Sequence, residues 1–111
     1  MIDAGAINSI IMVYVKHGWT LRRVLLSKTL KSSLADSQDF AGAELIDADY
    51  DALWFSRMRN ERETAWEIRH ISNTAYALVA VVDSEQDDEA ATLAETEQRF
   101  AASLANRAQG H

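Results

Sequence analysis

The sequence predicts an α+β fold in which an antiparallel sheet of four or five strands packs against helices, in the order α-β-α-β-β-β-β-α. Segments with a helical spacing of apolar residues lie near both ends of the chain, and strand-like segments with short turns lie between them. The 111 residues contain no proline, no internal repeat and no low-complexity linker. We therefore expect a single α+β domain over residues 1–111.

Two long helices are predicted, one at each end of the chain. The first covers Ala4–His17, because Asp3 is a good N-cap and Gly18 can adopt the left-handed conformation that ends a helix. The last begins at Asp83 and Ser84, and its first turns are acidic, as the positive end of the helix dipole favours. Its apolar stripe consists of Ala90, Leu93, Phe100, Ala101, Leu104 and Ala108.

Five strands and one short helix are expected between these two helices. The strands cover residues 19–26, 44–49, 52–59, 64–72 and 75–82. The short helix begins after Ser27 and ends near Asp36. The connections are a loop at 37–42, a charged turn at 60–63 and a tight turn at 72–74. The strand 75–82 is almost continuously apolar, which is typical of a central strand covered on both faces. We expect the first and last helices on one face, and the short helix or a second subunit on the other.

Pairing between strands 52–59 and 64–72 decides which side chains share a face. If Arg59 lies opposite Ala65, Trp54, Trp66 and Ile68 share an apolar face, and the charged residues of both strands share the other. A shift by one residue would mix charge into both faces, and burying an unpaired charge costs several kcal/mol. Continuing through the next turn adds alternate residues of strand 75–82 to the mixed face. The resulting candidate binding surface consists of Phe55, Arg57, Glu67, Arg69 and Tyr76.

The leading functional interpretation is a small acidic cytoplasmic binding or interaction module, self-associating through this mixed face, with a homodimer or another protein as its partner. A structural role of the same face, with Arg57 and Glu67 as a cross-strand ion pair, is the simpler alternative. A second alternative is a small-ligand-binding protein or enzyme with a pocket between sheet and helix, in which His70 acts as acid or base and Arg57 or Arg69 holds an anion. The absence of a nucleophile or metal signature favours binding over catalysis.

Composition argues against several other classes. Cysteine is absent, so no thiol nucleophile or cysteine-ligated metal is available, and we expect no cofactor, no metal site and a reducing compartment. The net charge of −6 disfavours nucleic acid, although Trp19, Arg22 and Arg23 could form a small stacking patch. No apolar run is long enough to span a membrane. Residues 47–51 open like a calcium loop, but Ala52 stands where that loop requires glycine.

Overall fold

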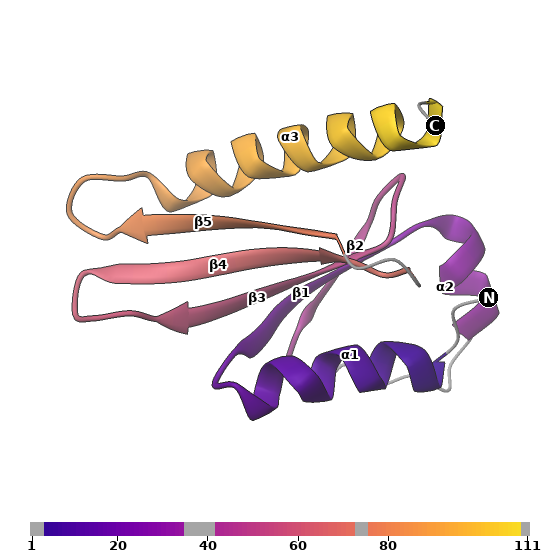
Figure 1. Cartoon of the computed structure of the whole chain (residues 1–111), viewed down its shortest axis with the longest axis horizontal. Helices are drawn as coiled ribbons and strands as arrows, with labels where there is room; N and C mark the ends of the chain where they lie inside the picture. The colour runs from indigo at the N-terminus through magenta and orange to yellow at the C-terminus, as the bar shows by residue number, and fades with distance from the viewer. Residues whose placement is uncertain (1–3, 35–41, 73–75, 110–111) are drawn as a thin grey trace.

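The computed structural model describes residues 4–34, 42–72 and 76–109 and shows a five-stranded sheet with one long helix on each face (Figure 1). The elements are α1 (Ala4–Lys16), β1 (Thr20–Leu26), α2 (Lys28–Leu34), β2 (Glu44–Asp47), β3 (Ala52–Met58), β4 (Glu63–His70), β5 (Ala77–Asp83) and α3 (Glu89–Gln109). The predicted α+β class and element order are confirmed. The predicted loop at 37–42 and tight turn at 72–74 fall mostly outside the described residues.

The sheet is mixed, which corrects the expectation of a purely antiparallel sheet. The strand order is β2-β1-β3-β4-β5, and β1 pairs with β2 in parallel, with Leu25 opposite Ile46. Parallel neighbours need a crossover connection between them, and α2 lies in that connection. β2 is an edge strand and carries Glu44 and Asp47, in agreement with the usual charge protection of sheet edges.

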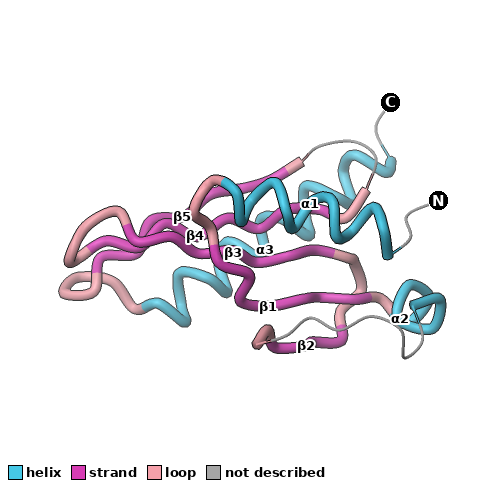
Figure 2. Tube along the Cα trace, turned by 90° about the horizontal axis from the view of Figure 1, so that it is seen from below, coloured by secondary structure: helices cyan, strands magenta, loops and turns pink. Residues whose placement is uncertain are grey.

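The two long helices cover opposite faces, not the same face as predicted. Figure 2 shows α1 in front of the sheet and α3 behind it. Ile7 packs with Leu53 and Phe55 beneath α1, whereas Leu93 and Phe100 of α3 pack with Trp54. Each face of β3 therefore has its own core, and β3 is the central strand. In the described part of the chain, no helix is long and apolar enough to cross a membrane.

The hairpin of β3 and β4 keeps the predicted faces with a different pairing. Arg57, and not Arg59, lies opposite Ala65, so the register differs from the prediction by two residues. The turn explains the shift, since the backbone N–H of Arg59 already donates to the carbonyl of Glu63 at 2.9 Å, and the Asn60 side chain accepts from the Glu63 N–H at 2.9 Å. Because side chains alternate along a strand, a shift of two preserves both faces.

The faces and position of β5 differ from the prediction. Leu78 lies opposite Ile68, and Val79 lies opposite Glu67, so each β5 side chain is on the face opposite to the one predicted. A change of one residue in the connection from β4 is sufficient for this inversion. β5 is also an edge strand and not the central one. Val82 is buried, Val79 and Val81 are exposed, and its other side chains are partly buried.

Candidate functional site

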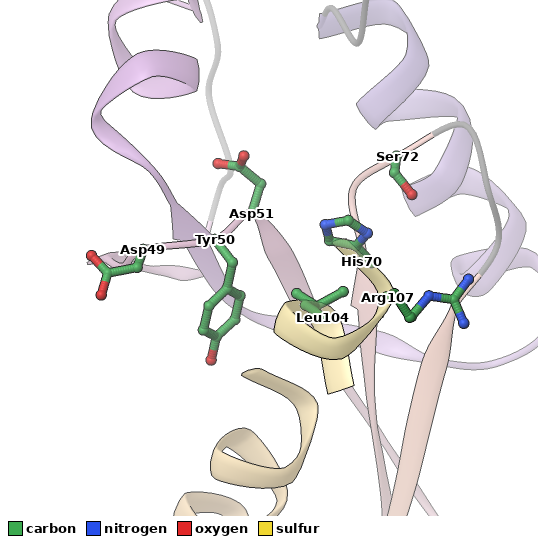
Figure 3. A pocket seen from close by; sticks show the side chains of 7 residues that line it. All are labelled: Asp49, Tyr50, Asp51, His70, Ser72, Leu104 and Arg107. Carbon is green, nitrogen blue, oxygen red and sulfur yellow. The ribbon is translucent and has the colours of Figure 1, made fainter. Parts of the chain in front are cut away.

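A cavity of about 510 Å³ lies where the beginning of β3, the end of β4 and the last turns of α3 meet (Figure 3). This volume is within the usual range of small-molecule sites. The residues that line it are Asp49, Tyr50, Asp51, His70, Ser72, Leu104 and Arg107.

Asp51 fixes one wall of the cavity by joining three elements. Its carboxylate accepts hydrogen bonds from the backbone N–H of Ser27 at 2.6 Å and from the Ser27 hydroxyl at 3.2 Å. Ser27 is the residue that precedes α2, and its hydroxyl also accepts from the N–H of Leu30 at 3.3 Å. The carbonyl of Asp51 accepts from the N–H of Ile71 at 2.9 Å, just after β4. The approach to β3, the start of α2 and the end of β4 are thereby held together.

Two of the lining residues, Tyr50 and His70, belong to an aromatic cluster around Phe100. Phe100 is fully buried, and Tyr50, His70 and Tyr76 surround it at centroid distances of 5.5, 6.1 and 5.3 Å. Burial, followed by the negative charge of Glu97, raises the pKa of Tyr50 to about 12. Tyr50 is therefore a neutral hydrogen-bonding group at physiological pH.

His70 is partly exposed and borders the cavity. Burial lowers the pKa of His70 below its ordinary value, Asp51 acts in the opposite direction, and the nearby positive charges of Arg69 and Arg107 lower it further. His70 is consequently neutral at pH 7, with one ring nitrogen able to accept a hydrogen bond and the other able to donate one. Its backbone N–H donates to the carbonyl of Tyr76 at 2.9 Å, which anchors the main chain of His70 beside β5.

Two unneutralised charges lie at opposite ends of the cavity. Figure 3 shows Asp49 and Arg107 pointing away from each other, with Tyr50, His70 and Leu104 between them. The Arg107 guanidinium lies 4.5 Å from the centroid of the Tyr76 ring, a cation–π contact that holds the side chain over the cavity's edge. Within residues 4–34, 42–72 and 76–109, neither Asp49 nor Arg107 forms an ion pair. The site is thus a dipolar cleft with an apolar and aromatic floor.

The structure does not assemble the predicted surface as a whole. Phe55 is fully buried, because the Tyr14 ring stacks on it at 4.0 Å with an interplanar angle of 6°. The Tyr14 hydroxyl donates a hydrogen bond to Glu67. Arg57 is exposed, but it lies opposite Ala65, so the predicted direct pair with Glu67 is not formed. Helix α1 covers the centre of this face.

The other two predicted residues are placed as follows. Arg69 remains on the α1 face, and its guanidinium donates to the carbonyl of His70. Tyr76 lies on the α3 face, stacked against Phe100. Tyr76 and Arg69 therefore lie on opposite sides of the sheet, which corrects the prediction that they share a surface.

Residues of the predicted stacking patch, Trp19 and Arg23, make contacts within the fold. Arg57 lies 4.6 Å from the centroid of the Trp19 ring and donates to the carbonyl of His17 at 2.9 Å. Arg23 lies 3.7 Å from carboxylates of both Glu44 and Glu97. These contacts account for the local concentration of basic and aromatic residues without a ligand.

Sequence reasoning identified His70 as a candidate but missed the acidic and basic walls of its cavity. The sequence pattern places Asp49 and Asp51 only in a segment that opens like a calcium loop, and it does not single out Arg107. Among the described residues, no three histidine, aspartate or glutamate side chains are arranged to hold a metal ion. Short polar residues just before a strand were the available signal for this wall.

No protein-family model, no curated protein and no solved structure matches this chain. The function of this chain is therefore inferred from the geometry of the described residues.

Proposed function

We propose that this chain is a small-molecule-binding protein whose ligand is a zwitterion of the size of an amino acid or a dipeptide. The observation that carries this proposal is the pair of unneutralised charges, Asp49 and Arg107, at the two ends of a cavity of about 510 Å³. A binding module was also the leading interpretation of the sequence, although through a different surface.

The charges of the cavity select the class of ligand. Asp49 and Asp51 contribute two negative charges, Arg107 contributes one positive charge, and His70 is neutral at pH 7. A phosphate or another dianion would meet net repulsion, whereas a molecule with one amine and one carboxylate matches both ends. The carboxylate would pair with the planar guanidinium of Arg107, and the amine would face Asp49.

The floor between the charges supplies the apolar part of the site. Leu104 and the Tyr50 ring are both half-buried and present apolar surface to the cavity. A hydrophobic side chain on the ligand would gain roughly 25 cal/mol for each Å² of apolar area removed from water. His70 can hydrogen-bond to a peptide group or an α-carboxylate placed between the charged ends.

A screen of uncharged-side-chain dipeptides tests the proposal, with binding followed by the rise in melting temperature and then by calorimetric titration. Ligand that binds only the native state stabilises it by RT ln(1 + [L]/Kd). The matched ligand controls are the same dipeptides acetylated at the amino end or amidated at the carboxyl end. We expect each cap to weaken binding by about tenfold, since one charge-assisted hydrogen bond contributes on the order of 1.5–3 kcal/mol and this site is partly open.

Matched protein variants localise the binding. Asp49→Asn should reduce affinity for the free dipeptide but not for its acetylated form. Arg107→Gln should reduce affinity for the free dipeptide but not for its amidated form. Arg99→Gln is the control, because Arg99 is an exposed arginine on the same helix and does not line the cavity. Binding that survives both cavity substitutions, or that is insensitive to the caps, would refute the proposal.

A cytoplasmic location also remains a proposal. The absence of cysteine and the net charge of −6 support it. Localisation of a tagged full-length chain by cell fractionation tests it directly.

A further inference from the structure

The outer edge of β5 presents unpaired backbone groups. The N–H of Ser84 donates to the carbonyl of Arg62 at 2.8 Å, and the carbonyl of Tyr76 accepts from His70 at 2.9 Å, so the even-numbered residues of this segment face β4. In an antiparallel ladder the alternate residues face the other way. The backbone groups of Ala77, Val79 and Val81 therefore point outward, and no described residue pairs with them.

This edge lacks the devices that usually prevent association. Natural edge strands carry lysine, proline, a bulge or an inward-pointing charge. From Ala77 to Val82 the strand has none of these, and its pairing with β4 is regular. Val79 and Val81 are 58% and 36% exposed on the α1 face, beside the part of the sheet that α1 covers. The strand is thus both apolar and open to pairing.

The two ends of the edge carry opposite charge. At the Ala77 end, Arg69 lies directly across the ladder and Arg107 lies over the ring of Tyr76. At the other end, Asp83, Glu85 and Asp87 follow one another around the turn into α3. Arg62 offsets part of this charge, with ion pairs of 2.8 Å to both Asp83 and Glu85. The edge therefore runs from basic to acidic.

We propose that two copies of this chain associate through their β5 edges, in antiparallel orientation about Ala80, so that the sheet continues across a two-fold axis. In this register each Val79 lies opposite the partner's Val81, and the exposed valines of both copies form one apolar row. Each basic Ala77 end meets the partner's acidic Asp83 end, twice by symmetry. Parallel pairing would place like charges together. The charge order thus selects a second copy in antiparallel orientation.

The test is the mass in solution of the full chain and of two valine variants, measured by sedimentation over a range of concentrations. Val79→Lys places a charge at the centre of the proposed interface. Val15→Lys is the matched control, because Val15 is 54% exposed and Val79 is 58% exposed, but Val15 belongs to α1 and not to β5. We expect a dimer for the native chain and for Val15→Lys, and a dimer dissociation constant roughly 100-fold higher for Val79→Lys, since like charges brought together at an interface cost several kcal/mol.

A backbone variant separates edge pairing from side-chain docking. Val79→Pro removes an N–H that points away from β4, so it should leave the fold intact and still weaken the dimer. Circular dichroism melting confirms that each variant is folded before its mass is interpreted. A monomeric native chain, a dimer unaffected by both Val79 substitutions, or a dimer lost only with Val15→Lys would each overturn the proposal. Dipeptide binding is measured independently, so its outcome does not decide whether two copies associate through their β5 edges.

Discussion

Substituting each of the two buried tryptophans on the α3 face by phenylalanine tests how polar groups are satisfied in this core. Trp54 and Trp66 are 0% and 4% exposed and contact each other edge to face, with centroids 6.0 Å apart. Trp54 Nε1 donates to a Glu97 carboxylate oxygen at 2.6 Å. Trp66 Nε1 is buried and has no hydrogen-bond partner in the described part of the chain. The two substitutions remove similar volume, but they differ in what happens to the N–H.

The difference in unfolding free energy follows from that contrast. Trp54→Phe loses a hydrogen bond to a charged acceptor, which contributes on the order of 1.5–3 kcal/mol, while Trp66→Phe relieves an unsatisfied donor that costs about 1–3 kcal/mol. Glu97 keeps its contact with Arg23 at 3.7 Å, so its own penalty is reduced. We therefore expect Trp54→Phe to be more destabilising than Trp66→Phe by roughly 2–4 kcal/mol.

Urea unfolding followed by far-ultraviolet circular dichroism measures this difference, provided that the unfolding free energy of both variants falls with urea concentration at the same slope as that of the native chain. Equal losses of stability, or a larger loss for Trp66→Phe, would show that the N–H groups do not differ in this way. The double variant provides a further check, because residues in contact are expected to be non-additive.

Three further predictions concern stability. Trp66→Ala should lower the unfolding free energy by roughly 3–5 kcal/mol in urea titration, because a large buried side chain is lost, and a loss under about 1 kcal/mol would contradict its place in the core. The pKa of His70 is lowered in the fold, so the unfolded chain binds more protons, and native stability should fall as pH decreases from about 6.5 through the folded pKa. His70→Gln should flatten this dependence of the melting temperature on pH. An unchanged dependence would contradict the lowered pKa of His70. The pKa of Tyr50 is raised to about 12, so stability should fall as pH rises above about 10, and Tyr50→Phe should lose part of this alkaline slope, whereas a steeper slope would contradict the burial argument.

Local features of the fold were predictable because short-range physics decides them. Gly18 has a φ of +88° two residues after the end of α1 at Lys16, as a left-handed helix stop requires. The separation of Trp54 from Arg57 across the sheet followed from the cost of burying charge, although the pairing itself was displaced by two residues. The alternation of apolar and polar residues along the strands therefore predicts the face on which a side chain lies more reliably than the residue with which it pairs.

Long-range placement was not predictable in the same way. An amphipathic helix reveals that one side is buried but not which face of a sheet buries it, so α1 and α3 were assigned to the same layer. The nearly continuous apolar sequence of β5 predicts a central strand, yet β5 lies at an edge of the sheet. The cavity combines residues 49–51, 70–72 and 104–107, which no local pattern brings together.

Chemical-shift mapping of the cavity tests the central claim most directly. With labelled histidine rings and leucine methyl groups, addition of a free dipeptide should shift the resonances of His70 and Leu104 in a saturable manner, and the doubly capped dipeptide should not do so at the same concentrations. Saturable shifts confined to α1, or equal responses to the free and capped peptides, would show that the dipolar cleft between Asp49 and Arg107 is not the binding site.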